Sequence, residues 1–215
     1  MRILKDLLFM FVVSLFFAGL TVSVNRALSN RISLNEKTRY TKQLLDVLKI
    51  PYPADASPEV LQDLERVHIQ KGRLNGRVVY RGLDNKGNPV GYAFPIGGKG
   101  FWGRIEGFLS TENEVRTIQA IVFTTHNETP GLGARIEEPW FRKQFENLLF
   151  TDAVSPGKYV EISKADSSGK NRLDGITGAT MTTKAVERIV NEDLKSILVN
   201  KDRIGRIQWE SPQGR

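Results

Sequence analysis

The feature that most constrains this chain is an apolar run near its N-terminus. Residues 7 to 24 contain no charged side chain. About 20 apolar residues suffice for one helical crossing of a bilayer, so the run predicts one N-terminal transmembrane helix. Arg2 and Lys5 before the run also suit a cleaved signal peptide. No clean cleavage site of small residues follows, however, and a retained anchor is the preferred interpretation.

The charges that flank the run do not fix its orientation in the membrane. Basic residues lie before it and after it: Arg2 and Lys5 on one side, and Arg26, Arg31, Lys37 and Arg39 on the other. The excess of Lys and Arg that marks a cytoplasmic side is therefore missing. A large C-terminal domain can be translocated whatever its charge, so both orientations are compatible with the charges.

Composition excludes several kinds of chemistry. The 215 residues include no cysteine and only two histidines, His68 and His126. Disulfides, iron–sulfur clusters and thiol catalysis are excluded, and a histidine-rich metal site is disfavoured. Any redox chemistry therefore requires a bound organic cofactor.

The net charge of +7 does not indicate a nucleic-acid-binding protein. The basic residues are spread along the chain, and no nucleic-acid-binding module is recognisable. They suit a solvated surface with some attraction to anionic lipid or to an acidic partner. Residues 201–215, which are basic and contain Trp209, are the best candidate for such a contact. The alternative is a frayed terminus.

Two helices are predicted before the main domain. Residues 31–49 suit a helix whose apolar side holds Tyr40, Leu44, Leu45 and Leu48, and two prolines follow it. Ser57 and Pro58 then suit the N-cap and first position of a second helix. Its predicted buried stripe consists of Val60, Leu61, Leu64 and Val67. His68, at the edge of this stripe, is expected to be packed rather than to be a ligand.

From residue 77 the apolar pattern changes to the alternation of strands. A hairpin is expected between residues 77–83 and 90–94, with further strands at 101–109, 115–125 and 158–164. Pro139 is expected to open a helix whose packed face holds Trp140, Phe141, Phe145, Leu148 and Leu149. A last helix carries Val186, Ile189, Val190, Ile197 and Leu198 on one face. The predicted fold class is α+β: an antiparallel sheet with packed helices, preceded by one transmembrane helix.

Two glycine-rich segments invite different interpretations. Gly98, Gly100 and Gly103 satisfy the Gly-x-Gly-x-x-Gly pattern of dinucleotide sites, but that pattern requires a helix after it. Residues 104–109 alternate like a strand instead, so an NAD site is rejected. These glycines suit a bent hairpin or a close approach of a ligand to the backbone.

The second segment precedes the last helix. Gly178 and Ala179 leave room for a bulky anion beside Thr180, and Thr182 or Thr183 is expected to cap the helix. The free N–H groups of a first helical turn bind phosphate, although many such loops are only capped turns.

Three stretches together resemble one protein family. Residues 174–180, Asp-Gly-Ile-Thr-Gly-Ala-Thr, resemble the flavinylation motif Asp-x-x-(Ser/Thr)-Gly-Ala-Thr of bacterial FMN-binding domains. Residues 128–133, Glu-Thr-Pro-Gly-Leu-Gly, are similar to a second loop of that family, and residues 98–103 are similar to a third. The domain is shared by the NqrC component of the sodium-translocating NADH:quinone oxidoreductase (Nqr) and by the RnfG component of the Rnf electron-transport complex. The resemblance covers roughly residues 70 to 200.

The resemblance implies a set of cofactor-binding residues. Thr180 would carry FMN through a phosphoester bond, and Leu132 with its glycine neighbours would pack against the isoalloxazine. His126 and Glu128 would lie near the ring edge or have only a surface role. The complete implied set is Thr180, Asp174, Thr177, Gly178, Ala179, Thr182, Thr183, Glu128, Thr129, Gly131, Leu132 and Gly133. No metal is expected in the finished carrier, although a magnesium ion at Asp174 would assist flavin transfer.

The implied function is that of a membrane-anchored, covalently flavinylated electron carrier. Its expected domains are an anchor at 1–30, a helical linker at 31–70, the FMN-binding domain at 71–200 and the basic tail at 201–215. The family carries this domain outside the cytoplasm, on the inner membrane. The expected partners are other membrane subunits of an electron-transport complex, a flavin transferase and membrane lipid. Such a carrier has no complete enzymatic activity alone, and ion translocation belongs to its partners.

Two alternatives stay open at this point. The chain could be a membrane-tethered assembly or regulatory module that binds FMN without a covalent bond or not at all. It could also be a surface that binds an acidic partner through its basic charge. Residues 101–102 favour an Nqr-like complex, whereas the short length favours an Rnf-like one.

Overall fold

The computed structural model describes residues 2–163 and 169–210 of the chain. Parts of the polar stretch at 166–171, of the predicted strand at 158–164 and of the tail at 201–215 therefore lie outside the described residues. The chain divides into two compact units, Met1–Arg39 and Tyr40–Arg215, which are described separately.

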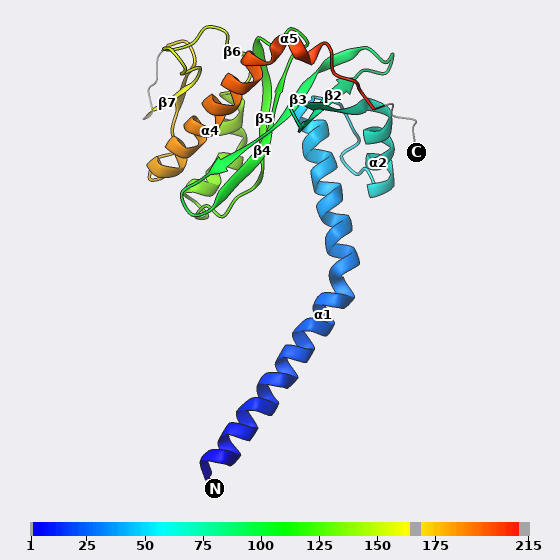
Figure 1. Cartoon of the computed structure of the whole chain (residues 1–215), viewed down its shortest axis with the longest axis vertical. Coiled ribbons are helices and arrows are strands. Elements are labelled where there is room, and N and C mark those ends of the chain that lie inside the picture. Colours follow the sequence, from blue (N-terminus) through cyan, green and yellow to red (C-terminus); the bar gives the residue numbers. More distant parts are fainter. Residues whose placement is uncertain (1, 164–168, 211–215) are drawn as a thin grey trace. The chain divides into compact units, whose positions relative to one another are not determined.

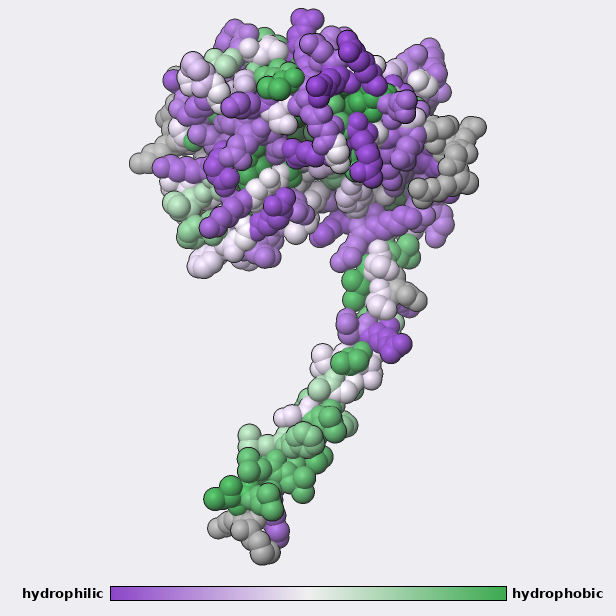
Figure 2. Space-filling view, viewed as in Figure 1, coloured by the Kyte–Doolittle hydropathy of each residue, from purple (hydrophilic) through white to green (hydrophobic). Residues whose placement is uncertain are grey.

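The first unit consists of a single helical segment. Helix α1 runs from Arg2 to Val47, and its residues Ile3–Ser29 form a largely apolar stretch. Figure 2 shows the hydrophobic side chains gathered along this part of α1. At 1.5 Å per residue, 27 residues span roughly 40 Å, which exceeds a hydrocarbon core of about 30 Å. The prediction of an N-terminal helix long enough for a membrane anchor is confirmed.

The second unit begins with the last turns of α1. Leu44, Leu45 and Leu48 are buried, as the helical spacing predicted, and α1 ends shortly before Pro51. Helix α2, Pro58–His68, starts at the predicted cap, where the hydroxyl of Ser57 accepts a hydrogen bond from the N–H of Val60.

The predicted buried stripe of α2 is only partly correct. Leu61 is buried and Leu64 is partly buried, but Val60 and Val67 are exposed. The reason is that α2 is covered on one narrow side, so that only the middle of the stripe is enclosed. His68 is packed, as expected, and its Nδ1 lies 3.0 Å from the carbonyl oxygen of Leu83.

A six-stranded sheet with the order β1-β2-β3-β4-β5-β6 forms the middle layer, and each pair of neighbours is antiparallel. The α+β class with an antiparallel sheet is therefore confirmed (Figure 1). The strands are β1 (Ile69–Leu74), β2 (Arg77–Leu83), β3 (Pro89–Lys99), β4 (Arg104–Thr111), β5 (Thr117–Thr125) and β6 (Leu148–Leu149). Residues 100–103 are the turn between β3 and β4, so the strand expected after the glycine pattern is present.

The predicted long helix after Pro139 is wrong. A 3₁₀ helix, Gly133–Glu137, is followed by the short α3, Pro139–Lys143, and Leu148–Leu149 then form β6 against β5. Asn147 has a φ of 63°, which ends the helical path and turns the chain into the sheet. Phe141 and Phe145 are buried as predicted, whereas Leu149 is exposed.

The two faces of the sheet carry separate cores. Helix α4, Thr180–Val199, packs on one face with Val186, Ile189, Val190 and Ile197 buried against alternate residues of β3, β4 and β5. On the opposite face, Leu44, Leu45 and Leu48 of α1 and Leu61 of α2 form the core. They share this core with Phe108 of β4 and Val122 of β5, which alternate along their strands with residues of the first core. Successive side chains of a strand point to opposite faces, which explains why neighbours such as Ala93 and Phe94 belong to different cores.

The C-terminal segment folds back onto the sheet (Figure 1). After α5, Lys201–Ile204, the ring of Trp209 stacks on Tyr92 at 5.7 Å, and the guanidinium of Arg81 lies 4.6 Å from the Trp209 ring centroid. The N–H of Glu210 donates to the carbonyl oxygen of Lys71. The frayed-terminus alternative is therefore wrong for residues 201–210.

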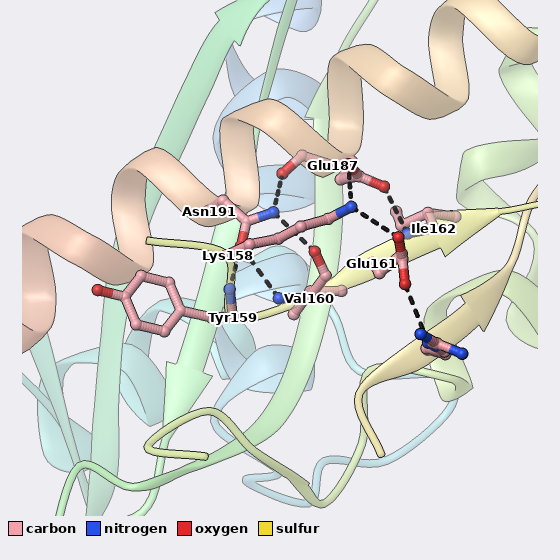
Figure 3. A network of polar contacts seen from close by, with 8 residues as sticks. Lys158, Tyr159, Val160, Glu161, Ile162, Glu187 and Asn191 are labelled. Atoms are coloured by element: carbon pink, nitrogen blue, oxygen red, sulfur yellow. Dashed lines mark hydrogen bonds and ion pairs between the residues drawn. The ribbon is translucent and has the colours of Figure 1, made fainter. Parts of the chain in front are cut away.

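A small parallel pair, β7 (Glu161–Ser163) and β8 (Arg172–Asp174), leads the chain back to α4. Polar side chains of α4 hold it (Figure 3). The side-chain oxygen of Asn191 accepts from the N–H groups of Tyr159 and Val160, and its nitrogen donates to the carbonyl of Val160. Glu187 accepts from the N–H of Ile162. These side chains replace the neighbouring strand that β7 lacks on this side.

Charged side chains add to this connection. The ammonium of Lys158 lies 2.8 Å from a carboxylate oxygen of Glu161 and 3.4 Å from one of Glu187. The hydrogen bond from Lys158, with the guanidinium of Arg172 beside it, lowers the pKa of Glu161 below its usual value. The pKa of Lys158 is raised in return by the same hydrogen bond to Glu161.

Replacing Asn191 with alanine is expected to destabilise the domain. The variant leaves the N–H groups of Tyr159 and Val160 without their acceptor, and each orphaned group costs about 1–3 kcal/mol. We expect the unfolding free energy of the full chain in detergent to fall by about 2–6 kcal/mol for the two groups together. Near-UV circular dichroism against urea measures it. Glu192→Ala, one residue along and exposed, is the matched control, and an equal loss in both variants contradicts the assigned role.

Candidate functional site

The start of α4 presents the hydroxyl predicted to be the attachment point. Thr180 is the first helical residue and is exposed, and Ala179 before it is the N-cap. The first main-chain bond of the helix runs from the N–H of Thr183 to the carbonyl oxygen of Ala179. An α-helix leaves the N–H groups of its first turn without intrahelical acceptors. Thr180 therefore lies beside donors that suit an anion.

Thr182 and Thr183 are not capping residues, and that prediction is wrong. Both lie inside the helix and are buried. The hydroxyl of Thr182 donates to Oε2 of Glu128 at 2.6 Å, and that of Thr183 accepts from the N–H of Ile176 at 3.2 Å. The helix starts earlier than expected because Ala179 takes the N-cap position. The two hydroxyls therefore fix the loop from within.

Glu128 joins the three glycine-rich stretches. Its side chain is 4% exposed, and Oε1 accepts from the N–H groups of Phe101 at 2.9 Å and Trp102 at 3.3 Å. Oε2 accepts from Thr182. A buried carboxylate is stable only when it is paired or well hydrogen-bonded, and here three donors serve this purpose. Of the two expectations for Glu128, a surface role is wrong, because the turn at 100–103 and helix α4 enclose it.

The loop after Glu128 packs against the start of α4. A Cβ on Gly133 would lie 2.5 Å from Oγ1 of Thr182 and 2.9 Å from Cβ of Glu128, so this close approach requires glycine. Gly178 has a φ of 81°, and a Cβ there would lie 3.1 Å from Cδ2 of Leu132. The two predicted loops are therefore in contact, and Leu132 lies directly beside the turn that precedes Thr180.

The remaining predicted residues occupy the same region. Thr129 and Gly131 are both exposed and lie in the turn that leads to Leu132. The carbonyl oxygen of Thr129 accepts a hydrogen bond from the N–H of Leu132 and closes this turn. Thr177 is exposed in the turn before Gly178. Asp174 ends β8, and its main-chain N–H and C=O both bond to the side chain of Gln144.

His126 lies behind the loop rather than at its surface. Its Nδ1 accepts from the N–H of Glu128 at 3.2 Å, so the proton of a neutral ring is on Nε2. Nε2 lies 3.1 Å from Oε1 of Glu137. His126 therefore supports the loop that carries Glu128. The described residues contain no group of three or more His, Cys, Asp and Glu side chains arranged to hold a metal ion.

Exposed apolar side chains lie on the segments that meet at the start of α4. Trp102 is 66% exposed, Met181 58%, Phe101 48% and Leu132 43%. The rings of Phe101 and Trp102 pack edge to face at 4.9 Å, on the turn that Glu128 holds. Exposed apolar side chains gathered in one place indicate a binding surface. Sequence reasoning did not identify Met181, because its only signal was its position directly after Thr180.

These features fit a ligand with an anionic end and a flat apolar body. The glycine at residue 178 and the free N–H groups suit a phosphate, and the exposed apolar side chains suit an aromatic ring. Gln144 also contributes, since it fixes the main chain of Asp174 in place. Sequence reasoning missed Gln144 because it assigned that residue to a long helix.

Comparison with known proteins finds similarity over part of the chain. Residues 100–195 match the family model described as "FMN-binding domain". The chain is 34% identical over 98 residues to NqrC of the Na(+)-translocating NADH-quinone reductase of Yersinia pestis, a match that covers 45% of this chain and 37% of that protein. It is 31% identical over 137 residues to the corresponding protein of Vibrio campbellii, covering 63% and 51%. The matches thus span about half the length of these relatives or less.

Two solved structures share the fold. The crystal structure of NqrC from Parabacteroides distasonis, also a component of a Na(+)-translocating NADH-quinone reductase, has a TM-score of 0.64 at 22% identity, covering 80% of this chain and 95% of that one. NqrC of Shewanella oneidensis has a TM-score of 0.58 at 18% identity, covering 74% and 99%. These matches confirm the arrangement of sheet and helices.

Removing the Glu128 carboxylate is expected to loosen the turn at 100–103. In Glu128→Ala the N–H groups of Phe101 and Trp102 and the hydroxyl of Thr182 lose their acceptor, at about 1–3 kcal/mol for each buried orphan. We expect hydrogen–deuterium exchange of residues 100–103 to accelerate more than that of the β4–β5 pair. Glu114→Ala, an exposed turn residue, is the control. Unchanged exchange at 100–103 in Glu128→Ala contradicts this role.

Proposed function

We propose that the chain is a membrane-anchored electron carrier with FMN held covalently on Thr180, and the match of residues 100–195 to the FMN-binding domain model supports this. The observation that carries the proposal is the placement of Thr180. Its exposed hydroxyl is at the first turn of α4, two residues after Gly178, which Leu132 contacts, and directly before the exposed Met181. No other exposed hydroxyl within the motif at 174–180 begins a helix of the described chain.

The phosphate end of the cofactor is served by Thr180 and by the backbone. Thr180 would hold FMN through its hydroxyl oxygen, which would displace the leaving group on the phosphorus of the flavin donor. The hydroxyl proton would leave with that group, and the protein would gain the mass of one FMN minus one water. The phosphoester keeps one negative charge, which a helix N-terminus stabilises by about 0.3–1 kcal/mol. Thr182 and Thr183 do not need to contact the phosphate, since their hydroxyls hold the loop that presents it.

The ring end is served by apolar side chains. Leu132 lies against the turn at Gly178, and Met181 follows Thr180 directly. Phe101 and Trp102 are held on the adjoining turn by Glu128. Covering these side chains with a flat aromatic ligand removes apolar surface from water at about 25 cal/mol per Å². When bound, FMN supplies reversible uptake of electrons, for which this chain has no group of its own.

A covalent bond and an anchor serve one purpose in this proposal. A loosely held flavin outside the cytoplasm is lost by dilution, whereas a phosphoester keeps it on the carrier. We place the domain on the extracytoplasmic side of the inner membrane, with α1 as a single-pass anchor in contact with lipid. A flavin transferase attaches the cofactor. The electron donor and acceptor are other membrane subunits, in an assembly like that named for the relatives, and ion translocation belongs to those subunits.

Thr180→Val is expected to abolish covalent flavin. The side chain keeps its shape but has no hydroxyl, so no Oγ–P bond forms. The full chain is co-expressed with a flavin transferase, and denatured protein is examined by in-gel flavin fluorescence and intact mass. We expect native protein to carry one FMN minus water and the variant to carry none. Thr151→Val, at an exposed hydroxyl outside the three motifs, is the matched control and keeps its flavin.

Two results contradict this proposal in different ways. Flavin retained by Thr180→Val moves the attachment to another hydroxyl. Native protein with the mass of its unmodified residues, although the transferase is active on a known substrate, removes the covalent carrier. A tethered assembly or regulatory module then becomes the better account.

Asp174→Ala is expected to reduce flavin loading without changing the fold. The position of residue 174 is set by main-chain bonds to Gln144, which the variant retains. If the carboxylate binds a magnesium ion during flavin transfer, its loss slows loading by about tenfold or more, equal to about 1.4 kcal/mol of the barrier. Time courses of in-gel fluorescence measure the rate, with Asp55→Ala as an exposed control. Normal loading refutes the role of Asp174.

A further inference from the structure

A second surface includes none of the residues used by the proposed function. It is a groove between β1 and the C-terminal segment, lined by residues 72–75 on one side and by residues 203 and 206–210 on the other. We call it the C-terminal groove. The side chains of Ile207 and Trp209, which are among the lining residues, pack directly on Gly72.

One wall of the groove is the open edge of the sheet. β1 pairs only with β2, so its other edge has no strand beside it in the described chain. The carbonyl oxygen of Lys71 faces this edge, because it accepts from the N–H of Glu210. Main-chain groups of an antiparallel strand alternate in direction, so the N–H and C=O of Arg73 face the same edge. An open edge is a template for pairing with another extended chain.

The groove carries an excess of positive charge. Three arginines line it, Arg73, Arg203 and Arg206, against one carboxylate, Glu210. All three arginines are exposed. Arg73 donates to the carbonyl oxygen of Gly76, and Arg203 to the side-chain oxygen of Asn75. Among the described residues, none of the three forms an ion pair with a carboxylate. Their remaining donors suit carboxylates, which guanidinium groups bind through paired hydrogen bonds.

We propose that the C-terminal groove binds an extended acidic segment of a partner protein. The main chain of that segment pairs with Arg73 at the edge of β1, and its carboxylates contact Arg73, Arg203 and Arg206. Main-chain pairing supplies orientation, and the arginines select acidic side chains, as in other cases where a peptide adds to a sheet edge.

A membrane surface suits the groove less well. Binding to anionic lipid usually adds an aromatic or aliphatic side chain that enters the interface. The aromatic side chain of this region, Trp209, is stacked on Tyr92 and lies under Arg81, so it is not available for insertion. An open strand edge also offers main-chain N–H donors next to C=O acceptors. This arrangement matches the main chain of a peptide and not a lipid headgroup.

Hexaglutamate is a direct probe of this groove. The full chain is placed in nanodiscs of neutral phosphatidylcholine, and binding of fluorescein-labelled hexaglutamate is measured by anisotropy at low salt. We expect Arg73→Glu/Arg206→Glu to weaken binding by about tenfold or more, where tenfold corresponds to about 1.4 kcal/mol. Arg66→Glu/Arg116→Glu changes the net charge equally at exposed positions outside the groove, and it should change the affinity less than about twofold if local contacts dominate.

Two further measurements decide the kind of occupant. Hexaglutamate is expected to slow hydrogen–deuterium exchange of β1 near Arg73, and uncharged hexaglutamine is not. Equal weakening by both double variants overturns the proposal, because attraction would then come from net charge alone. Absence of hexaglutamate binding also overturns the proposal. So does binding to phosphatidylserine vesicles that is lost only in Arg73→Glu/Arg206→Glu, if the peptide leaves exchange at β1 unchanged. The latter result makes a lipid headgroup the occupant.

Discussion

The burial of the Glu128 carboxylate is the constraint on which the rest of the site depends. A carboxylate removed from water is tolerated only when donors replace the water, and here they come from two other parts of the chain. The turn at 100–103 supplies two N–H groups and α4 supplies the hydroxyl of Thr182. The turn at 100–103 has no buried apolar side chain of its own to fix it, because it consists of two glycines and two exposed aromatic residues. One side chain therefore holds three segments that are distant in sequence.

This arrangement explains why the site combines rigidity with exposure. The groups that fix the geometry, Glu128, Thr182 and Thr183, point inward and are buried. The groups suited to a ligand, Thr180, Leu132, Met181 and the rings of Phe101 and Trp102, point outward from the same short segments. A hydroxyl that both held the loop and reacted with a ligand would lose its internal hydrogen bond on modification. Dividing these roles between Thr180 and Thr182 avoids that loss, since a phosphoester on Thr180 leaves the bond from Thr182 to Glu128 in place.

Sequence alone predicted the parts of the fold in which a single pattern dominates. The uncharged run at 7–24 indicated the apolar helix, the alternation from residue 77 onward indicated β2 to β5, and Ser57 and Pro58 marked the start of α2. It failed where tertiary contacts override local preference. β1 has a polar, glycine-containing sequence that becomes a strand by pairing with β2, and Leu148 and Leu149 match a helical stripe until Asn147 redirects the chain. At the site, the motif located Thr180 and its loop. Only the packing reveals that Thr182 faces Glu128, because sequence spacing does not tell which way a side chain points.

The same reasoning extends to the segment that delivers the chain to Thr180. β7 and β8 form a pair too short to be stable alone, since an isolated two-stranded pair is marginal in water. Their stability comes from side chains: Asn191 and Glu187 of α4 bond the main chain of residues 159–162, and Gln144 bonds the main chain of Asp174. Helix α4 thus acts twice, because its first turn presents Thr180 and its middle turns hold the strands that lead to it. A displacement of α4 would therefore move Thr180 together with residues 159–162, whereas Asp174 would stay bonded to Gln144.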